Sequence, residues 1–140
     1  MDHPECIFCN IQNPNLVITN TSDGIAMIYP EPVRPGHVVV GVKQHKQYLH
    51  DISEDEARKM FALANRMAKA IVEMTRAEKV YVVGVGDGDK HFHVHLIPKM
   101  PNDAKLGPYI FGEKGWAASV GSKFEAAEIA KYVKALKQKV

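Results

Sequence analysis

The sequence lacks the features that mark a secreted, membrane-spanning or nucleic-acid-binding protein. Its 140 residues include only two cysteines, and a chain of this length folds on one core without disulfide cross-links. No run reaches the roughly 18 to 20 apolar residues that a membrane helix needs. Lysine and arginine total 18 against 16 acidic residues, so the net charge of +2 gives no electrostatic reason to expect nucleic acid or an anionic membrane as a partner.

The overall composition is that of an ordinary globular domain, with 46% apolar and 24% charged residues. The first ten residues, MDHPECIFCN, carry acids and cysteines where a signal peptide carries a basic and then an apolar segment. We therefore expect a cytoplasmic protein. Because no internal repeat or low-complexity linker interrupts the chain, we expect residues 1–140 to form a single domain that ends in an arm and a helix over about residues 101–140.

Short segments rich in valine and isoleucine alternate with turn-forming residues and predict antiparallel strands. The glycine-rich segment GVGDGD, residues 84–89, predicts a tight connection between the last two of them. The five predicted strands are Leu16–Thr19, Gly24–Tyr29, His37–Lys43, Lys79–Val85 and His91–Ile97.

Two stretches have the apolar spacing of amphipathic helices. Ser53 with Glu56 fits a capping box, and the apolar residues that follow recur at helical spacing, which predicts a helix over about Glu54–Met74. Ser122 with Glu125 repeats the capping signal before a second helix that runs towards the C-terminus. The order of elements predicts an α+β fold, an antiparallel sheet of about five strands with two helices.

The string HFHVHLIP, which starts at residue 91, carries the most chemical information. On a strand, side chains alternate between faces, so His91, His93 and His95 should project from one face while the apolar residues between them pack on the other. Fold stability gives no reason for three crowded imidazoles. The alternatives to a reactive site are a coincidental exposed face and a purely metal-binding ladder of histidines.

This string resembles the histidine triad motif, His-φ-His-φ-His-φ-φ with φ apolar, of the histidine triad family of nucleotide hydrolases and transferases. The segment Arg34–Val40, RPGHVVV, followed by Lys43-Gln44-His45, is similar to the family's Pro-Gly-His-φ-φ-φ strand and its trailing Lys-x-His. With the N-terminal Cys-x-x-Cys, the resemblance spans most of residues 6–98. It implies a histidine-triad-like fold.

The resemblance also implies roles for three histidines. Transfer at phosphorus needs a nucleophile, a proton for the leaving group and donors to the phosphate oxygens, and imidazole supplies all three near neutral pH. In related proteins the middle triad histidine, here His93, attacks the α-phosphorus and forms a nucleotidyl-histidine that water resolves. His95 would donate to the phosphate oxygens or the leaving group, and His37 would complete the cluster. Transferase branches place glutamine at the third position, so His95 favours a hydrolase.

The spacing of Cys6 and Cys9 fits a zinc half-site, a redox pair or two unrelated thiols. A closed structural zinc site needs four ligands, so the pair requires two more. In zinc-bearing members of the family, the histidine of the Lys-x-His segment and the first triad histidine complete the site. The resemblance thus implies a structural Cys₂His₂ zinc site formed with His45 and His91.

Two positions depart from the family pattern. Tyr29 stands where the family usually has an aspartate or asparagine that holds the ribose hydroxyls, and a phenol cannot grip two hydroxyls as a carboxylate does. Asp87 and Asp89 stand where many members have Gly-Gln-x-Val, and carboxylates there would repel a polyphosphate. We treat Tyr29 and Asp87 as candidate substrate-binding residues. Trp116, in the predicted arm, would cover a dimer contact or stack on a base.

The resemblance implies a nucleotide hydrolase that cleaves a phosphoramidate, an adenylylated amine or a dinucleoside polyphosphate. The alternatives are a non-enzymatic nucleotide-binding or adaptor protein that keeps the fold, and a nucleotidyltransferase. Related hydrolases pair with two-fold symmetry, which implies a homodimer formed about the predicted helix 54–74 and strand 79–85.

Overall fold

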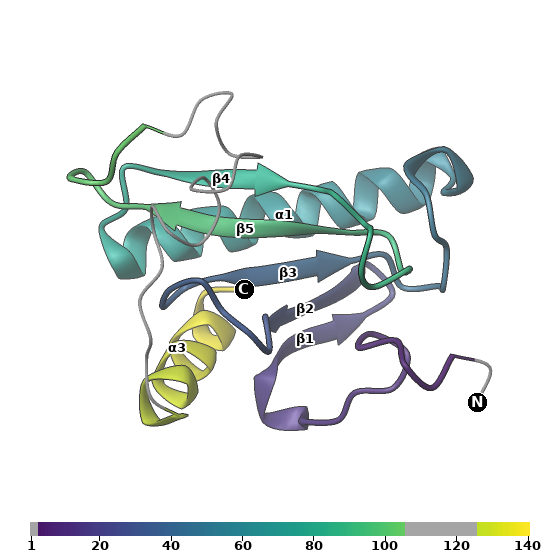
Figure 1. The fold of residues 1–140 in the computed structure, drawn as a ribbon, viewed down its shortest axis with the longest axis horizontal. Helices are drawn as coiled ribbons and strands as arrows, with labels where there is room; N and C mark the ends of the chain where they lie inside the picture. Colours follow the sequence, from purple (N-terminus) through teal and green to yellow (C-terminus); the bar gives the residue numbers. More distant parts are fainter. Residues whose placement is uncertain (1–2, 106–125) are drawn as a thin grey trace.

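The computed structural model describes residues 3–105 and 126–140. They form an antiparallel sheet of five strands, in the order β1-β2-β3-β5-β4, with two α-helices in the described ranges (Figure 1). The strands are β1 (Val17–Thr21), β2 (Gly24–Ile28), β3 (Val38–Gly41), β4 (Lys79–Val83) and β5 (His93–Lys99), and the helices are α1 (Glu54–Thr75) and α3 (Ala126–Lys139). Two short 3-10 helices, η1 (Pro14–Leu16) and η2 (Leu49–Asp51), precede β1 and α1. The predicted α+β fold is confirmed.

Helix α1 begins where its capping residues predict. The Ser53 hydroxyl accepts a hydrogen bond from the backbone N–H of Glu56 at 3.0 Å, and the Glu56 carboxylate accepts one from the backbone N–H of Ser53 at 3.2 Å. The helix ends at Thr75, and its C-cap residue, Arg76, adopts a left-handed conformation. Helix α3 is also observed, whereas its predicted capping pair and Trp116 lie outside the described residues.

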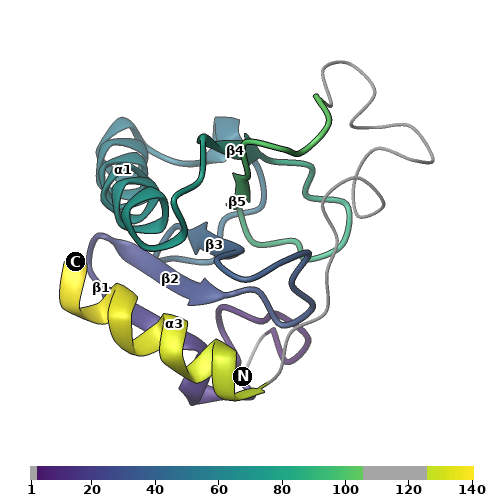
Figure 2. The ribbon, with the colours of Figure 1, turned by 90° about the vertical axis from the view of Figure 1, so that its left-hand side faces the viewer.

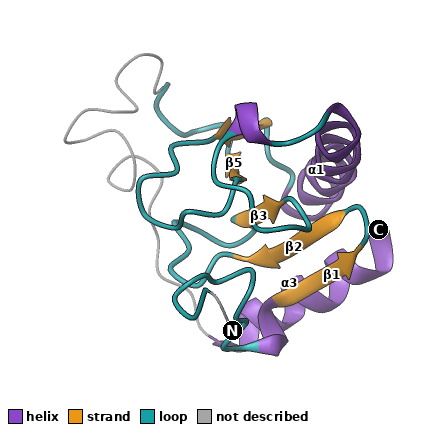
Figure 3. Ribbon diagram, turned by 90° about the vertical axis from the view of Figure 1, so that its right-hand side faces the viewer, coloured by secondary structure: helices purple, strands orange, loops and turns teal. Residues whose placement is uncertain are grey.

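The two faces of the sheet are covered differently. Both helices pack on one face, where their apolar side chains meet those of the strands in the main core (Figure 2). The N-terminal segment and the connecting loops lie on the opposite side (Figure 3). A second cluster of buried residues, Cys6, Phe8, Ile25, Met27 and Val39, fixes the N-terminal segment to that face. The helices thus cover one face of the sheet, and the N-terminal segment and loops contribute the side chains on the other face.

The predicted tight connection before β5 was wrong. Strand β4 ends at Val83 and β5 begins only at His93, so residues 84–92 form a long loop. On the side of β5 that faces β3, the Phe92 backbone bonds to the chain that follows β3, donating to Lys46 O at 2.6 Å and accepting from Val42 N at 3.2 Å. His91 precedes the strand instead of lying on it.

Within the described ranges, no helix has both the length and the apolar character required to span a lipid bilayer.

Candidate active site and metal centre

The N-terminal segment brings two cysteines against two histidines that lie far away in the sequence. The Sγ atom of Cys6 lies 3.4 Å from Nδ1 of His91, and the Sγ atom of Cys9 lies 3.3 Å from Nδ1 of His45 and 3.5 Å from Nδ1 of His91. All four ligand atoms lie within 4.8 Å of one another. Bonds of roughly 2.0–2.3 Å in a tetrahedral zinc site place ligand atoms about 3.3–3.8 Å apart. The three sulfur–nitrogen distances match this range, and the wider separations, up to 4.8 Å, would shorten when such an ion binds.

Hydrogen bonding prepares His91 for this arrangement. Its Nε2 lies 2.6 Å from the carbonyl oxygen of Val42, which can only accept, so the proton resides on Nε2 and the Nδ1 lone pair faces the thiols. Burial lowers the pKa of His91 and raises the pKa of the Cys6 thiol to about 12. A metal bound as a thiolate complex would therefore displace a proton from Cys6. His3, which no motif marked, stacks on His45 with ring centroids 3.5 Å apart.

The Phe8 ring lies between the cysteine–histidine cluster and the triad residue His93. Its ring centroid lies 4.9 Å from that of His91 and 5.3 Å from that of His93. The ring occupies the space above Gly41, where an added Cβ would lie 2.8 Å from a Phe8 ring carbon. Glycine at position 41 is thus required for the N-terminal segment to pack this closely against the sheet.

Three buried or partly buried imidazoles meet on the same face, beside a pocket of about 270 Å³ that His93 and His95 line. His37, fully buried on the neighbouring segment, places its Nε2 2.9 Å from Nδ1 of His95. The ring centroids of His93 and His95 lie 5.1 Å apart. The structure therefore brings together the three residues that the sequence marked as catalytic candidates.

The proton positions in this cluster follow from its hydrogen bonds. The backbone N–H of Val33 donates to Nδ1 of His37 at 3.0 Å, which leaves the proton of His37 on Nε2. That Nε2–H donates to Nδ1 of His95, so the proton of neutral His95 is on its own Nε2. Burial, with a contribution from the neighbouring imidazole, lowers the pKa of His37 to about 3 and that of His95 to about 4, so both are neutral at pH 7.

His93 has the opposite tautomer. Its Nδ1 lies 2.5 Å from the carbonyl oxygen of His91, which accepts the Nδ1 proton and leaves the lone pair on Nε2. Two imidazoles of one pocket thus present different chemistry, a basic Nε2 on His93 and an Nε2–H donor on His95. This pairing suits nucleophilic attack beside a hydrogen-bond donor.

The rest of the pocket is acidic and aromatic. The Tyr29 ring lies 4.9 Å from His37 and 4.8 Å from His95, and burial raises the pKa of its phenol. Residues 85–89 of the loop 84–92 also line the pocket, including Asp87 and Asp89. Asp89 accepts a hydrogen bond from the backbone N–H of Ile7 at 3.0 Å, which ties this loop to the N-terminal segment.

Comparison with known proteins assigns this fold to a family. A family model described as the HIT domain matches residues 10–102. The chain belongs to the HIT family. The adenosine 5'-monophosphoramidase HNT1 of Saccharomyces cerevisiae is 32% identical to it over 122 residues, 81% of this chain and 70% of that protein. A bis(5'-adenosyl)-triphosphatase of Dictyostelium discoideum is 24% identical over 103 residues, 69% of this chain and 68% of that protein.

Solved structures of HIT proteins share the fold. A HIT-like protein from Bartonella henselae has a TM-score of 0.75 and 18% identity, with 98% of this chain and 97% of that chain covered. A zinc-bound histidine triad family protein from Mycobacterium smegmatis has a TM-score of 0.71 and 22% identity, with 96% of this chain and 94% of that chain covered. The resemblance read from the sequence is thereby confirmed at the level of family and fold.

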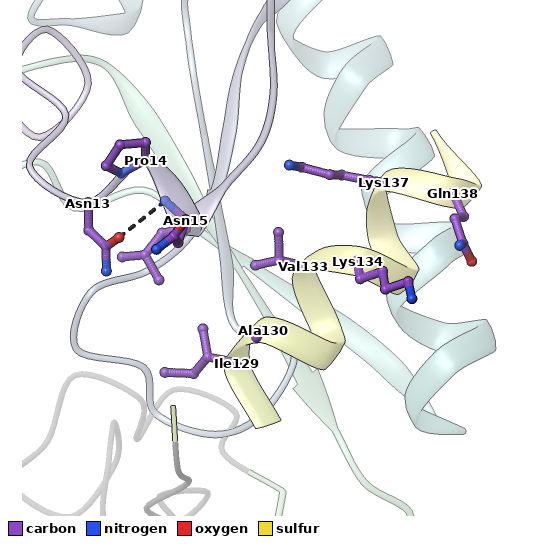
Figure 4. Close-up of a pocket in the computed structure, with 10 residues that line it drawn as sticks. Asn13, Pro14, Asn15, Ile129, Ala130, Val133, Lys134, Lys137 and Gln138 are labelled. Carbon is purple, nitrogen blue, oxygen red and sulfur yellow. Dashed lines mark hydrogen bonds between the residues drawn. The ribbon is translucent and has the colours of Figure 1, made fainter. Parts of the chain in front are cut away.

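A larger cavity of this HIT protein, about 600 Å³, lies elsewhere, between η1 and α3 (Figure 4). Among the described residues, its lining comes from residues 13–16 and 129–138 and includes asparagines, lysines and apolar side chains but no histidine or cysteine. The described part of its lining therefore offers none of the histidines and cysteines that gather on the opposite face of the sheet.

Proposed function

We propose that this HIT protein is a nucleotide hydrolase that cleaves nucleoside phosphate derivatives through a nucleotidyl-histidine formed on His93. The observation that carries the proposal is the pairing of opposite tautomers in one pocket, with a lone pair on Nε2 of His93 and a proton on Nε2 of His95. The family match supports it, as do relatives named for phosphoramidase and dinucleoside polyphosphate hydrolase activities.

The proposed reaction has two displacements. In the first, the His93 lone pair forms a bond to the α-phosphorus while the bond from phosphorus to the leaving group breaks and its electron pair moves to the leaving atom. The Nε2–H of His95 donates a hydrogen bond to that atom or to a phosphate oxygen, and an amine leaves after taking a proton from water. In the second, water attacks phosphorus, loses a proton to solvent and releases His93 unchanged. His37 acts through His95, whose Nδ1 it holds by hydrogen bonding.

The charge of the pocket favours one substrate class within this activity. Its described lining includes the carboxylates of Glu31, Asp87 and Asp89 but no lysine or arginine. A dinucleoside polyphosphate would bring several negative charges close to these groups, whereas an adenosine phosphoramidate has one negative charge, at the reacting phosphate, and releases an amine that carries no negative charge. We therefore favour nucleoside phosphoramidates and adenylylated amines, with Tyr29 in contact with the nucleoside and Asp87 beside the leaving amine.

Zinc is the metal that best suits the cluster of Cys6, Cys9, His45 and His91. Two sulfur and two nitrogen donors in a partly buried site are typical of structural zinc. Bound zinc would supply a rigid link between the N-terminal segment and the chain that enters β5. The M. smegmatis neighbour, described as zinc-bound, supports the same choice of metal. Because free thiols persist in reducing compartments, this site also fits a cytoplasmic protein.

A homodimer is the proposed assembly. In the described sheet, β4 is an edge strand, and with α1 it leaves a largely apolar groove lined by Ala68, Val72, Val80 and Val82 together with Lys69 and Glu73. Val82 is 59% exposed and Phe61 of α1 is 42% exposed. An edge strand beside such a surface is suited to pairing with a second copy of the chain.

The direct test of the proposed function is turnover with matched variants. Wild-type protein should release AMP from an adenosine phosphoramidate faster than from diadenosine triphosphate, and His93→Ala should abolish both reactions. His50→Ala is the control, because the His50 side chain is 80% exposed and does not line the pocket. Tight binding of both compounds without turnover by the wild-type protein would instead favour the nucleotide-binding adaptor. Transfer of the nucleotide to an acceptor other than water would favour the transferase.

A further inference from the structure

The loop that connects β2 to β3 carries both His37 and the N–H group that sets its tautomer. The backbone N–H of His37 donates to Arg34 O at 3.1 Å, and Gly36 has a φ of 92°, a conformation that favours glycine. This turn folds the loop back on itself, so that the Val33 N–H reaches Nδ1 of the His37 side chain. The tautomer of His37 therefore depends on the conformation of residues 33–37.

The Arg34 side chain attaches this loop to the end of β5. Its guanidinium donates to Pro98 O at 3.1 Å and to both carboxylate oxygens of Asp103, through Nη1 to Oδ2 and through Nη2 to Oδ1, the latter at 3.2 Å. Asp103 is itself held, because its Oδ2 accepts from the Met100 backbone N–H at 2.8 Å. The two side chains of the ion pair are only 13% and 14% exposed, so solvent screens this forked pair less than a surface pair.

Pro98 lies on the same strand as His95, three residues further on. The loop is thus linked to β5 at two points, by the hydrogen bond of His37 to His95 and by that of Arg34 to Pro98. The loop has few backbone donors of its own, since positions 30, 32 and 35 are prolines. The Arg34 guanidinium therefore supplies side-chain hydrogen bonds from a loop in which three residues have no backbone N–H.

We infer that Arg34 and Asp103 are positioning residues that keep the Val33 N–H against His37, and through His37 keep the proton of His95 on Nε2. The forked ion pair, the Arg34 to Pro98 bond and the two consecutive imidazole bonds form one continuous chain to the pocket. The effect of this chain of contacts on catalysis rests on the proposed function, whereas its effect on the tautomer of His37 does not.

The first experiment needs no substrate. Nitrogen NMR of the histidine side chains at pH 7 should show wild-type His37 as the Nε2–H tautomer alone, and Arg34→Ala should show a mixture of the two neutral tautomers. Asp103→Asn, which keeps the shape but removes the charge, should show a smaller change in the same direction. Arg66→Ala is the control, since it removes an exposed ion pair to Asp23 outside this chain of contacts. A His37 that keeps one tautomer in both Arg34→Ala and Asp103→Asn would overturn the inference.

The second experiment compares two leaving groups. Because a hydrogen bond from His95 matters most where charge accumulates on a basic leaving atom, Arg34→Ala should slow kcat for an adenosine phosphoramidate of 4-methoxyaniline by roughly ten-fold and for that of 4-nitroaniline by less than about two-fold. Arg34→Lys, which keeps the charge but not the fork, should fall in between. An equal loss for both compounds would indicate a merely structural role and contradict the inference. Absence of wild-type turnover would refute the proposed hydrolase and leave the NMR result to decide on Arg34.

Discussion

Acid should destabilise this protein between pH 7 and pH 5 because it buries neutral histidines. The pKa of His37 is lowered to about 3 and that of His95 to about 4, both by burial first, whereas an exposed histidine in the unfolded chain titrates near about 6.5. Between these values the unfolded chain binds more protons than the folded chain, so stability is lost as the pH falls. Each histidine contributes a loss of about 2 kcal/mol from pH 7 to pH 5, and the pair about 4 kcal/mol.

The assay is urea denaturation at pH 7, 6 and 5, with a variant that isolates the pair. His37→Gln retains a polar side chain but does not titrate, so its stability should fall by about 2 kcal/mol less than that of the wild type over the same pH range. Effects of acid on the cysteine and histidine cluster are present in both proteins and cancel in the comparison. Parallel losses of stability in wild type and His37→Gln would refute the assignment of a neutral, buried His37.

Three further predictions concern the metal cluster, the packing of the N-terminal segment and the dimer. The double variant Cys6→Ser, Cys9→Ser should lose the one zinc per chain that metal analysis of the wild type should detect, and its thermal midpoint should drop while part of the activity remains; zinc retained by the variant would exclude the pair as ligands. Gly41→Ala should lower the free energy of unfolding by about 1–3 kcal/mol, since its Cβ would overlap an aromatic ring, and an unchanged value in urea titrations would show that the segment is not packed there. Val82→Glu should convert a dimer into a monomer in sedimentation at micromolar concentration, and a wild-type protein that sediments as a monomer would reject the dimer.

Local signals predicted the regular elements well. The start of α1 depends on two residues three positions apart, Ser53 and Glu56, whose mutual hydrogen bonds form from the helix itself, so the sequence pattern alone was sufficient. The alternation of apolar residues likewise placed His93 and His95 on one side of a strand. These features depend on neighbours in the chain and not on the rest of the fold.

Features that depend on distant pairing were predicted less well. The sequence pattern extended β5 back to His91, but the Phe92 N–H bonds to Lys46 O and β5 begins only at His93. The contact of His91 Nε2 with the carbonyl oxygen of Val42 leaves its Nδ1 facing the cysteines. The glycines of loop 84–92 suggested a tight turn, yet the loop is nine residues long and lines one side of the pocket. Glycine content allows a tight turn without requiring one.

The tautomers of the candidate site could not be predicted from spacing. They depend on which backbone groups face each ring: Val33 N–H for His37 and the carbonyl oxygen of His91 for His93. The family resemblance suggested which histidines matter, and the hydrogen bonds give a physical reason for different roles. Likewise, no sequence motif connects Arg34 with Asp103, because the contact exists only once β5 and the following turn are in place.

The most direct test of the central claim is to locate the covalent intermediate. Wild-type protein mixed with an adenosine phosphoramidate, quenched in alkali within the first turnover and digested, should yield AMP attached to the peptide that contains His93 and to no other histidine. Turnover with that peptide unmodified at every quench time, or AMP attached to a different residue, would contradict attack by His93.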